Sequence, residues 1–146
     1  MPSVHASAVL VGARAVLIRG PSGAGKSRLA LALLHAAEVS QLPFAMLVAD
    51  DRSHLDPRHG RLLVRPAPEL RGLIEVHGLG IRRLPCEPVA VVGLVVDLAA
   101  PDGGRLPAPA SQTAMIDGIE LARLAVAPGA DPLPLVLAAL STEPVP

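Results

Sequence analysis

The sequence predicts an α/β fold in which a mixed sheet is flanked by helices, and three observations support this prediction. Short runs rich in Val, Ile, Leu and Ala have the length of strands. One of these runs leads through a glycine-rich segment into a stretch of strong helix formers, and a second helix-forming stretch lies near the end of the sequence. The length of 146 residues suits one hydrophobic core, so we expect residues 1–146 to form a single domain.

The first part of the sequence predicts a unit of strand, loop and helix. Residues 8–11 and 14–19 are apolar runs on either side of a turn at Gly12, which predicts a hairpin or two adjacent strands. Residues 26–38 are rich in helix formers and predict a helix. The expected apolar stripe of this helix consists of Leu29, Leu33 and Leu34. The glycine-rich segment is therefore expected at the N-terminus of a helix.

A second buried strand is predicted at residues 45–49, directly before two adjacent acids, Asp50 and Asp51. The stretch before it, residues 38–44, is expected to be a surface loop. The polar stretch after it, residues 52–60, is also expected to be a loop. The two acids thus lie where a strand ends.

The rest of the sequence predicts further strands and one more helix. The expected strands are residues 61–65, 73–76, 89–98 and 119–126. Residues 101–112 are expected to be a loop. A helix is predicted to start near Asp131 and Pro132 and to run to Leu140, because Asp can cap a helix and Pro is tolerated in its first turn. Residues 142–146 are expected to form a flexible tail.

The composition excludes several classes of partner. Thirteen basic and thirteen acidic residues give a formal net charge of zero, so no overall field attracts nucleic acid or an anionic membrane. Aromatic residues make up 1% of the chain, which argues against stacking on bases. The apolar runs are too short to span a bilayer. A single cysteine, Cys86, cannot form an internal disulfide, and a cytoplasmic location is expected.

A phosphate-binding motif connects the first strand unit to its helix. The segment matches G-x-x-x-x-G-K-[ST], a P-loop, which predicts binding of ATP with Mg²⁺. Its residues are Gly20, Pro21, Ser22, Gly23, Ala24, Gly25, Lys26 and Ser27. Lys26 is expected to reach the β- and γ-phosphates, and the Ser27 hydroxyl is expected to bind Mg²⁺. The alternative is a glycine-rich turn that only caps a helix.

Two further observations bear on the same site. Lys26 is the only lysine, while the other twelve basic residues are Arg, so the exception falls inside the motif. Asp50 and Asp51 are expected at the carboxyl edge of the sheet, facing the P-loop, where a carboxylate can serve metal binding or catalysis. Adjacent acids point in different directions, so at most one is expected to be catalytic. The alternative is an ordinary transition from strand to turn.

Four segments together resemble the catalytic domain of the HPr kinase/phosphorylase family. They are His5, the P-loop, residues 47–51 (LVADD) and residues 71–81 (RGLIEVHGLGI). The resemblance covers about residues 1–95 and is weak beyond them. It implies a P-loop nucleotide-binding domain of the HPr kinase/PEP carboxykinase-like type, in the short single-domain form known from some proteobacteria.

The resemblance implies a role for each matching residue. Lys26 and Ser27 would hold the ATP phosphates and Mg²⁺, and Asp51 would be the catalytic base. Glu75 would help to place the metal, and Asp50 would support either the metal or Asp51. His5 would position or sense phosphate. Without the resemblance, His5 could be a surface residue and Glu75 could lie on a solvent-facing side of its strand.

The resemblance also implies a partner, an HPr-type phosphocarrier protein that is phosphorylated on serine, and a homo-oligomer, commonly a hexamer. Two departures modify this expectation. His77 stands where the family usually has Arg, and the late Arg- and Gly-containing segment associated with phosphorolysis has no counterpart. Phosphorylase activity is therefore expected to be weak or absent. The alternatives are a P-loop kinase for a small-molecule acceptor and a nucleotide-binding regulator with little turnover.

Overall fold

The computed structural model describes residues 2–145, so Met1 and Pro146, the last residue of the expected tail, lie outside the description. Two α-helices, two short 3-10 helices and ten strands form in the described residues. The helices are α1 (Lys26–Glu38), η1 (Pro68–Leu70), η2 (Pro109–Gln112) and α2 (Pro132–Ser141). The strands are β1 (Ser3–Val11), β2 (Arg14–Arg19), β3 (Ala45–Ala49), β4 (Arg52–Arg58), β5 (Arg61–Pro66), β6 (Leu73–Val76), β7 (Gly80–Arg83), β8 (Ala90–Asp97), β9 (Thr113–Ile116) and β10 (Ile119–Ala125).

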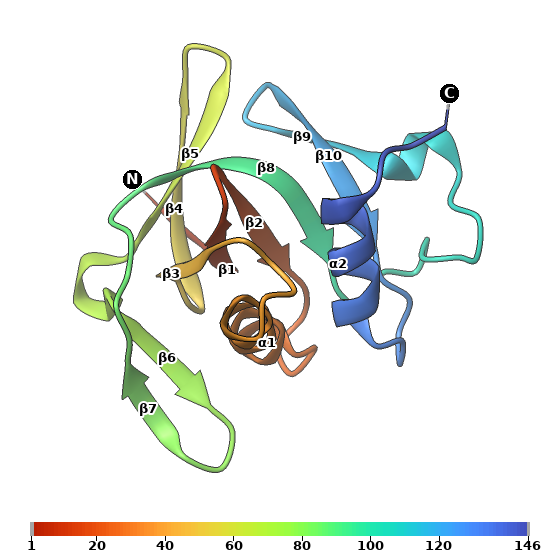
Figure 1. The fold of residues 1–146 in the computed structure, drawn as a ribbon. Helices are drawn as coiled ribbons and strands as arrows, with labels where there is room; N and C mark the ends of the chain where they lie inside the picture. The colour runs from red at the N-terminus through yellow and green to blue at the C-terminus, as the bar shows by residue number, and fades with distance from the viewer. Residues whose placement is uncertain (1, 146) are drawn as a thin grey trace.

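The main sheet is mixed, and the predicted α/β class is confirmed (Figure 1). Strand β1 pairs antiparallel with both β2 and β3. Strand β8 pairs in parallel with β2 and with β10, and β9 pairs antiparallel with β10. Strands β2, β3, β8 and β10 therefore run in one direction, and their carboxyl ends meet at one edge of the sheet.

The hairpin of β4 and β5 bridges the beginnings of β1 and β8. Strand β4 pairs with Ser3–His5 of β1, and β5 pairs with β8 at Leu63 and Val91. The prediction of a loop at residues 52–60 is wrong, because β4 occupies most of this range. Its polar side chains are compatible with a strand since they find partners: the buried Ser53 hydroxyl donates to Ala6 O at 2.9 Å, and Asp56 accepts from Arg58 Nε at 2.8 Å.

Two short strands were not predicted, and most other expected elements are confirmed within one or two residues. Strand β7 has no alternation of apolar and polar residues that would have indicated a strand, and all of its residues are exposed. Strand β9 is only four residues long. Helix α1 begins and ends as predicted. Helix α2 begins after Asp131, whose side chain accepts a hydrogen bond from Leu133 N at 3.2 Å.

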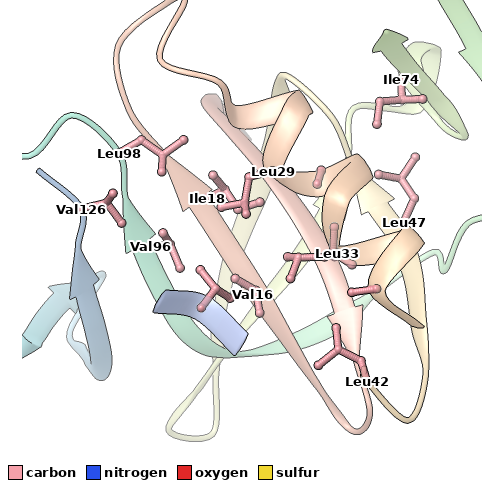
Figure 2. Close-up of a cluster of buried hydrophobic side chains, with 14 residues drawn as sticks. Val16, Ile18, Leu29, Leu33, Leu42, Leu47, Ile74, Val96, Leu98 and Val126 are labelled. Atoms are coloured by element: carbon pink, nitrogen blue, oxygen red, sulfur yellow. The ribbon is translucent and has the colours of Figure 1, made fainter. Parts of the chain in front are cut away.

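Side chains of α1 pack on one face of the main sheet, and Figure 2 shows this core. Leu29 and Leu33 of α1 lie against Val16 and Ile18 of β2, and Val136 of α2 belongs to the same cluster. A second cluster fills the opposite face, toward β4 and β5, and includes Ala15, Leu17, Leu62, Val64 and Val92. Alternate residues of β2 thus pack into the two clusters on opposite faces of the sheet. Packing on both faces holds the end of this strand in place.

Strands β6 and β7 form a separate two-stranded hairpin that projects beside α1 (Figure 1). Ile74 anchors it in the core with α1, and Leu84 N donates to Gly72 O at 2.8 Å at its base. Among the described residues, no helix is long and apolar enough to cross a membrane.

Candidate functional site

The glycine loop, residues 20–25, connects the carboxyl end of β2 to the N-terminus of α1. Gly23 has a φ of 82° and Gly25 a φ of 100°, conformations that side-chain-bearing residues rarely adopt. Gly25 is the N-cap of α1 and provides no side-chain cap, and the first turn of this helix contains no acidic residue. The first N–H groups of α1 are therefore available to an anion.

Lys26, the first residue of α1, folds its side chain back over the loop. Its Nζ donates to Gly20 O at 2.9 Å and to Pro21 O at 3.2 Å. These carbonyl groups hold the ammonium group at the start of the glycine loop. Ser27 follows on the same helical turn and donates from Oγ to Asp50 Oδ1 at 2.7 Å.

Asp50 is buried beneath the glycine loop and the start of α1, with an exposed fraction of 5%. Its carboxylate accepts three hydrogen bonds from separate elements. The Ser7 hydroxyl of β1 and the Ser27 hydroxyl of α1 both donate to Oδ1, at 2.8 and 2.7 Å, and Glu75 N of β6 donates to Oδ2 at 3.1 Å. Asp50 therefore joins the strand, the helix and the projecting hairpin that surround the site.

Asp51 has the opposite surroundings. Its backbone has a φ of 67°, a left-handed conformation that Asp tolerates better than most residues. Its side chain is 64% exposed, and its Oδ1 lies 3.9 Å from Nδ1 of His5, whose side chain is 66% exposed. The expectation that the two acids point in different directions is thus met, with Asp51 as the accessible one.

A cavity of about 670 Å³ lies above the loop, between the start of α1 and the β6–β7 hairpin. We call it the loop cavity. Its lining residues are Ser22, Gly23, Gly25, Lys26, Ser27, Arg28, Leu31, Asp51, Glu75, Val76 and His77. The wall thus combines the cations Lys26 and Arg28 with the carboxylates Asp51 and Glu75, which suits a ligand that carries both phosphate groups and a metal ion.

The structure brings most of the expected site residues together. Lys26, Ser27, Asp51 and Glu75 line the loop cavity, whereas Asp50 lies beneath it. His5 is not among its lining residues and reaches the site through Asp51. In the described part of the chain, no group of three or more His, Cys, Asp or Glu side chains is arranged to hold a metal ion. A metal here would need oxygen atoms from the bound ligand as well.

Sequence reasoning missed Ser7 and Arg28. Ser7 lies on β1, and its Oγ also accepts a hydrogen bond from Asp51 N at 3.3 Å, so it contacts both adjacent acids. A serine in a strand carries no signal of such a role. Arg28 lies directly after the phosphate motif and lines the cavity, which its position could have suggested.

A family model described as the HPr Serine kinase C-terminal domain matches residues 1–84. This range contains the glycine loop, both adjacent acids and the β6–β7 hairpin. The HPr kinase/phosphorylase of Limosilactobacillus reuteri (strain DSM 20016) is 39% identical over 80 residues, which are 54% of this chain and 23% of that protein. That of Caldicellulosiruptor bescii is 40% identical over 78 residues, 53% of this chain and 23% of the relative. The matched segment thus spans less than a quarter of these relatives.

A solved structure resembles the chain over nearly its whole length. It is described as the Hpr(Ser) kinase/phosphatase from Coxiella burnetii, with a TM-score of 0.75 and 25% sequence identity. The similarity covers 96% of this chain and 88% of the other. The family model therefore covers the part of the chain that contains the loop cavity, and the structural relative extends the similarity beyond residue 84.

Proposed function

Because the chain belongs to the HPr Serine kinase C-terminal domain family, we propose that it is an ATP- and Mg²⁺-dependent serine kinase that phosphorylates an HPr-type phosphocarrier protein. The main support for the proposal is that Lys26, Ser27 and the exposed carboxylate of Asp51 all line the loop cavity. In this proposal, residues 20–27 act as a P-loop within one catalytic domain.

The residues of the loop cavity fit ATP with Mg²⁺. Gly23 and Gly25 line the cavity, and a Cβ added to either would meet no atom within 4 Å, so the backbone is open to a close ligand. The uncapped start of α1 and Lys26 offer donors and positive charge for phosphate oxygens. Ser27 and Glu75 offer the oxygen atoms that Mg²⁺ prefers, which leaves the carboxylate of Asp51 free to act as the base. When bound, Mg²⁺ would neutralise charge that develops on the phosphate oxygens.

The proposed transfer assigns one task to each residue. Lys26 Nζ holds phosphate oxygens, and the carboxylate of Asp51 accepts the proton of the acceptor serine hydroxyl. The serine oxygen forms a bond to the γ-phosphorus while the bond to the β,γ-bridging oxygen breaks, and ADP leaves. Asp50 keeps the Ser27 hydroxyl in place beneath the site. His5, 3.9 Å from Asp51, orients that carboxylate or contacts phosphate.

The exposure of Asp51 supports a protein as the acceptor. A serine on another folded protein can reach only a base that is open to the surface, and the Asp51 side chain is 64% exposed. Assembly as a homo-oligomer is a further part of the proposal that follows from the family resemblance. Weak or absent phosphorylase activity is another part, and it follows from the two departures from the family, His77 and the missing late Arg- and Gly-containing segment.

The test is incubation of the purified protein with ATP, Mg²⁺ and an HPr-type carrier, with phosphoserine on the carrier measured by intact-mass spectrometry. The proposal expects a mass increase of one phosphate that disappears with Lys26→Ala. ATP binding without any transfer to the carrier would contradict it. Transfer to a small hydroxyl compound would instead favour the small-molecule kinase, and ATP binding with no acceptor at all would favour the regulator.

A further inference from the structure

An ion-pair cluster lies beside the start of the glycine loop. Asp97, the last residue of β8, accepts from Arg19 Nε on Oδ1 at 2.7 Å and from Arg19 Nη2 on Oδ2 at 2.8 Å. Arg123 of β10 donates from Nε to Asp97 Oδ2 at 2.6 Å. Its Nη1 and Nη2 donate to Asp102 at 2.6 and 3.1 Å. The two guanidinium groups are neutralised by two carboxylates. The cluster therefore has no net positive charge with which Arg19 could attract a phosphate group.

The cluster joins the carboxyl ends of three parallel strands. Arg19 of β2 is paired with Asp97 of β8, and Asp97 is paired with Ala125 of β10. Backbone hydrogen bonds continue the pairing past the strand ends: Leu98 N donates to Arg19 O at 2.8 Å, and Val126 N donates to Asp97 O at 2.9 Å. The side-chain cluster therefore reinforces a point where the regular sheet ends and the glycine loop begins.

The glycine loop rests directly on this point. Gly20 follows Arg19, and a Cβ added to Gly20 would lie 3.1 Å from Leu98 Cβ and 3.2 Å from Leu98 O. Lys26 Nζ is held by the carbonyl oxygens of Gly20 and Pro21. A shift of Arg19 or Leu98 would thus move the groups that hold the Lys26 ammonium.

We propose that Arg19, Asp97 and Arg123 form a positioning cluster that fixes the start of the glycine loop and, through it, the place of Lys26 Nζ. None of the three lines the loop cavity, so they act through the loop and not on a ligand. The functional consequence rests on the proposed role of Lys26 in phosphate binding. The place of Lys26 Nζ is a property of the protein without ligand and does not depend on that role.

Burial makes the cluster suited to this task. The side chains of Asp97 and Arg123 are 15% and 14% exposed, and that of Arg19 is 36% exposed. Shielded, two-point pairs between guanidinium and carboxylate groups fix direction as well as distance. Burial alone would raise the pKa of Asp97, but hydrogen bonds from Arg19 and Arg123 outweigh it and lower the pKa. The carboxylate therefore stays charged and keeps both partners.

A second role must be separated from positioning. Arg123 Nη1 also donates to Ser111 O at 3.0 Å, and with Asp102 it ties residues 102–111 to the sheet. A cluster that served only to hold this segment would affect stability without affecting Lys26. The test therefore needs a readout at Lys26 and a variant that loses a comparable ion pair elsewhere.

Lys26 provides that readout because it is the only lysine in the chain. Its rate of acylation by an N-hydroxysuccinimide ester, followed by peptide mass mapping, reports how firmly the loop carbonyls hold Nζ. The variants are Asp97→Asn and the milder Arg19→Gln, which leaves Asp97 paired with Arg123 and adds no lysine. The matched control is Asp56→Asn, which removes the partner of Arg58 at 2.8 Å in β4, away from the loop.

The proposal expects Lys26 to react about five-fold faster or more in Asp97→Asn and Arg19→Gln, equivalent to the loss of at least one hydrogen bond. It expects the wild-type rate in Asp56→Asn. Wild-type rates in both cluster variants would overturn the proposal, and so would equal acceleration in the control. If Asp97→Asn does not fold, Arg19→Gln decides.

A second arm separates this inference from the proposed function. ATP with Mg²⁺ should slow acylation of Lys26 in the wild-type protein if the loop binds phosphates. Failure of this protection would count against the proposed function, whereas the rates without nucleotide test the positioning cluster alone.

Discussion

Asp50 and Asp51 are adjacent in the chain, yet the carboxylate of one is buried beneath the loop cavity and that of the other lines it. The cause is the backbone of Asp51, whose φ of 67° turns the chain between β3 and β4. Asp50 consequently accepts hydrogen bonds from Ser7, Ser27 and Glu75, while Asp51 lies open beside His5. The same substitution at the two positions should therefore affect different properties.

Asp50→Asn is expected to lower the free energy of unfolding by about 1–3 kcal/mol, because one buried acceptor oxygen is replaced by an amide group that cannot accept. Urea unfolding followed by circular dichroism measures this loss. Asp51→Asn is the matched control and should stay within about 0.5 kcal/mol of wild type, since its side chain is exposed and Asn tolerates the same backbone conformation. Equal losses in both variants would contradict the assignment of Asp50 as the buried junction.

Gly25→Ala is expected to weaken ATP binding by about ten-fold or more, because a methyl group would project into the space proposed for the phosphates. The left-handed backbone should also cost about 1–2 kcal/mol of stability. Gly129→Ala is the control, because Gly129 has a φ of 81° but does not line the cavity. It should lose similar stability and keep wild-type affinity in titration calorimetry; equal affinity in both variants would count against the phosphate cradle.

The ion-pair cluster predicts a specific response to acid. Burial raises the pKa of Asp97 but its arginine partners lower it more, and the hydrogen bond from Arg123 is the main cause that lowers the pKa of Asp102. Their contribution to stability is thus present above the unfolded-state pKa of about 3.9 and is lost as the pH falls below it toward the folded-state values. Asp97→Asn should show a shallower loss of stability below about pH 4. Unfolding curves with the same pH dependence as wild type would contradict this prediction.

The sequence predicted the parts of the site that local chemistry specifies. The glycine pattern with Lys26 and Ser27, the helix that follows and the strand before Asp50 each carry a signal within a few residues, and the structure places them as a continuous unit. The polar strand β4 was missed because its burial depends on partners in β1 and β5 that no local pattern reveals.

Long-range partners explain the other gaps. Arg19 and Asp97 are separated by 78 positions, and the pairing follows only from the parallel contact of β2 with β8. The different surroundings of the two acids depend on the backbone angle of Asp51, which sequence alone does not specify. The loop cavity also needs the β6–β7 hairpin beside α1, an arrangement that becomes visible only in three dimensions (Figure 1).

The most direct test of the central claim compares wild type with Asp51→Asn in one set of measurements, phosphoserine formed on an HPr-type carrier and the Kd for ATP with Mg²⁺. The account predicts that transfer falls by about 100-fold or more, as expected when a positioned base is lost, while the Kd changes less than about three-fold. Undiminished transfer, or a collapse of ATP binding together with transfer, would contradict the assignment of Asp51 as the base that faces the phosphate site.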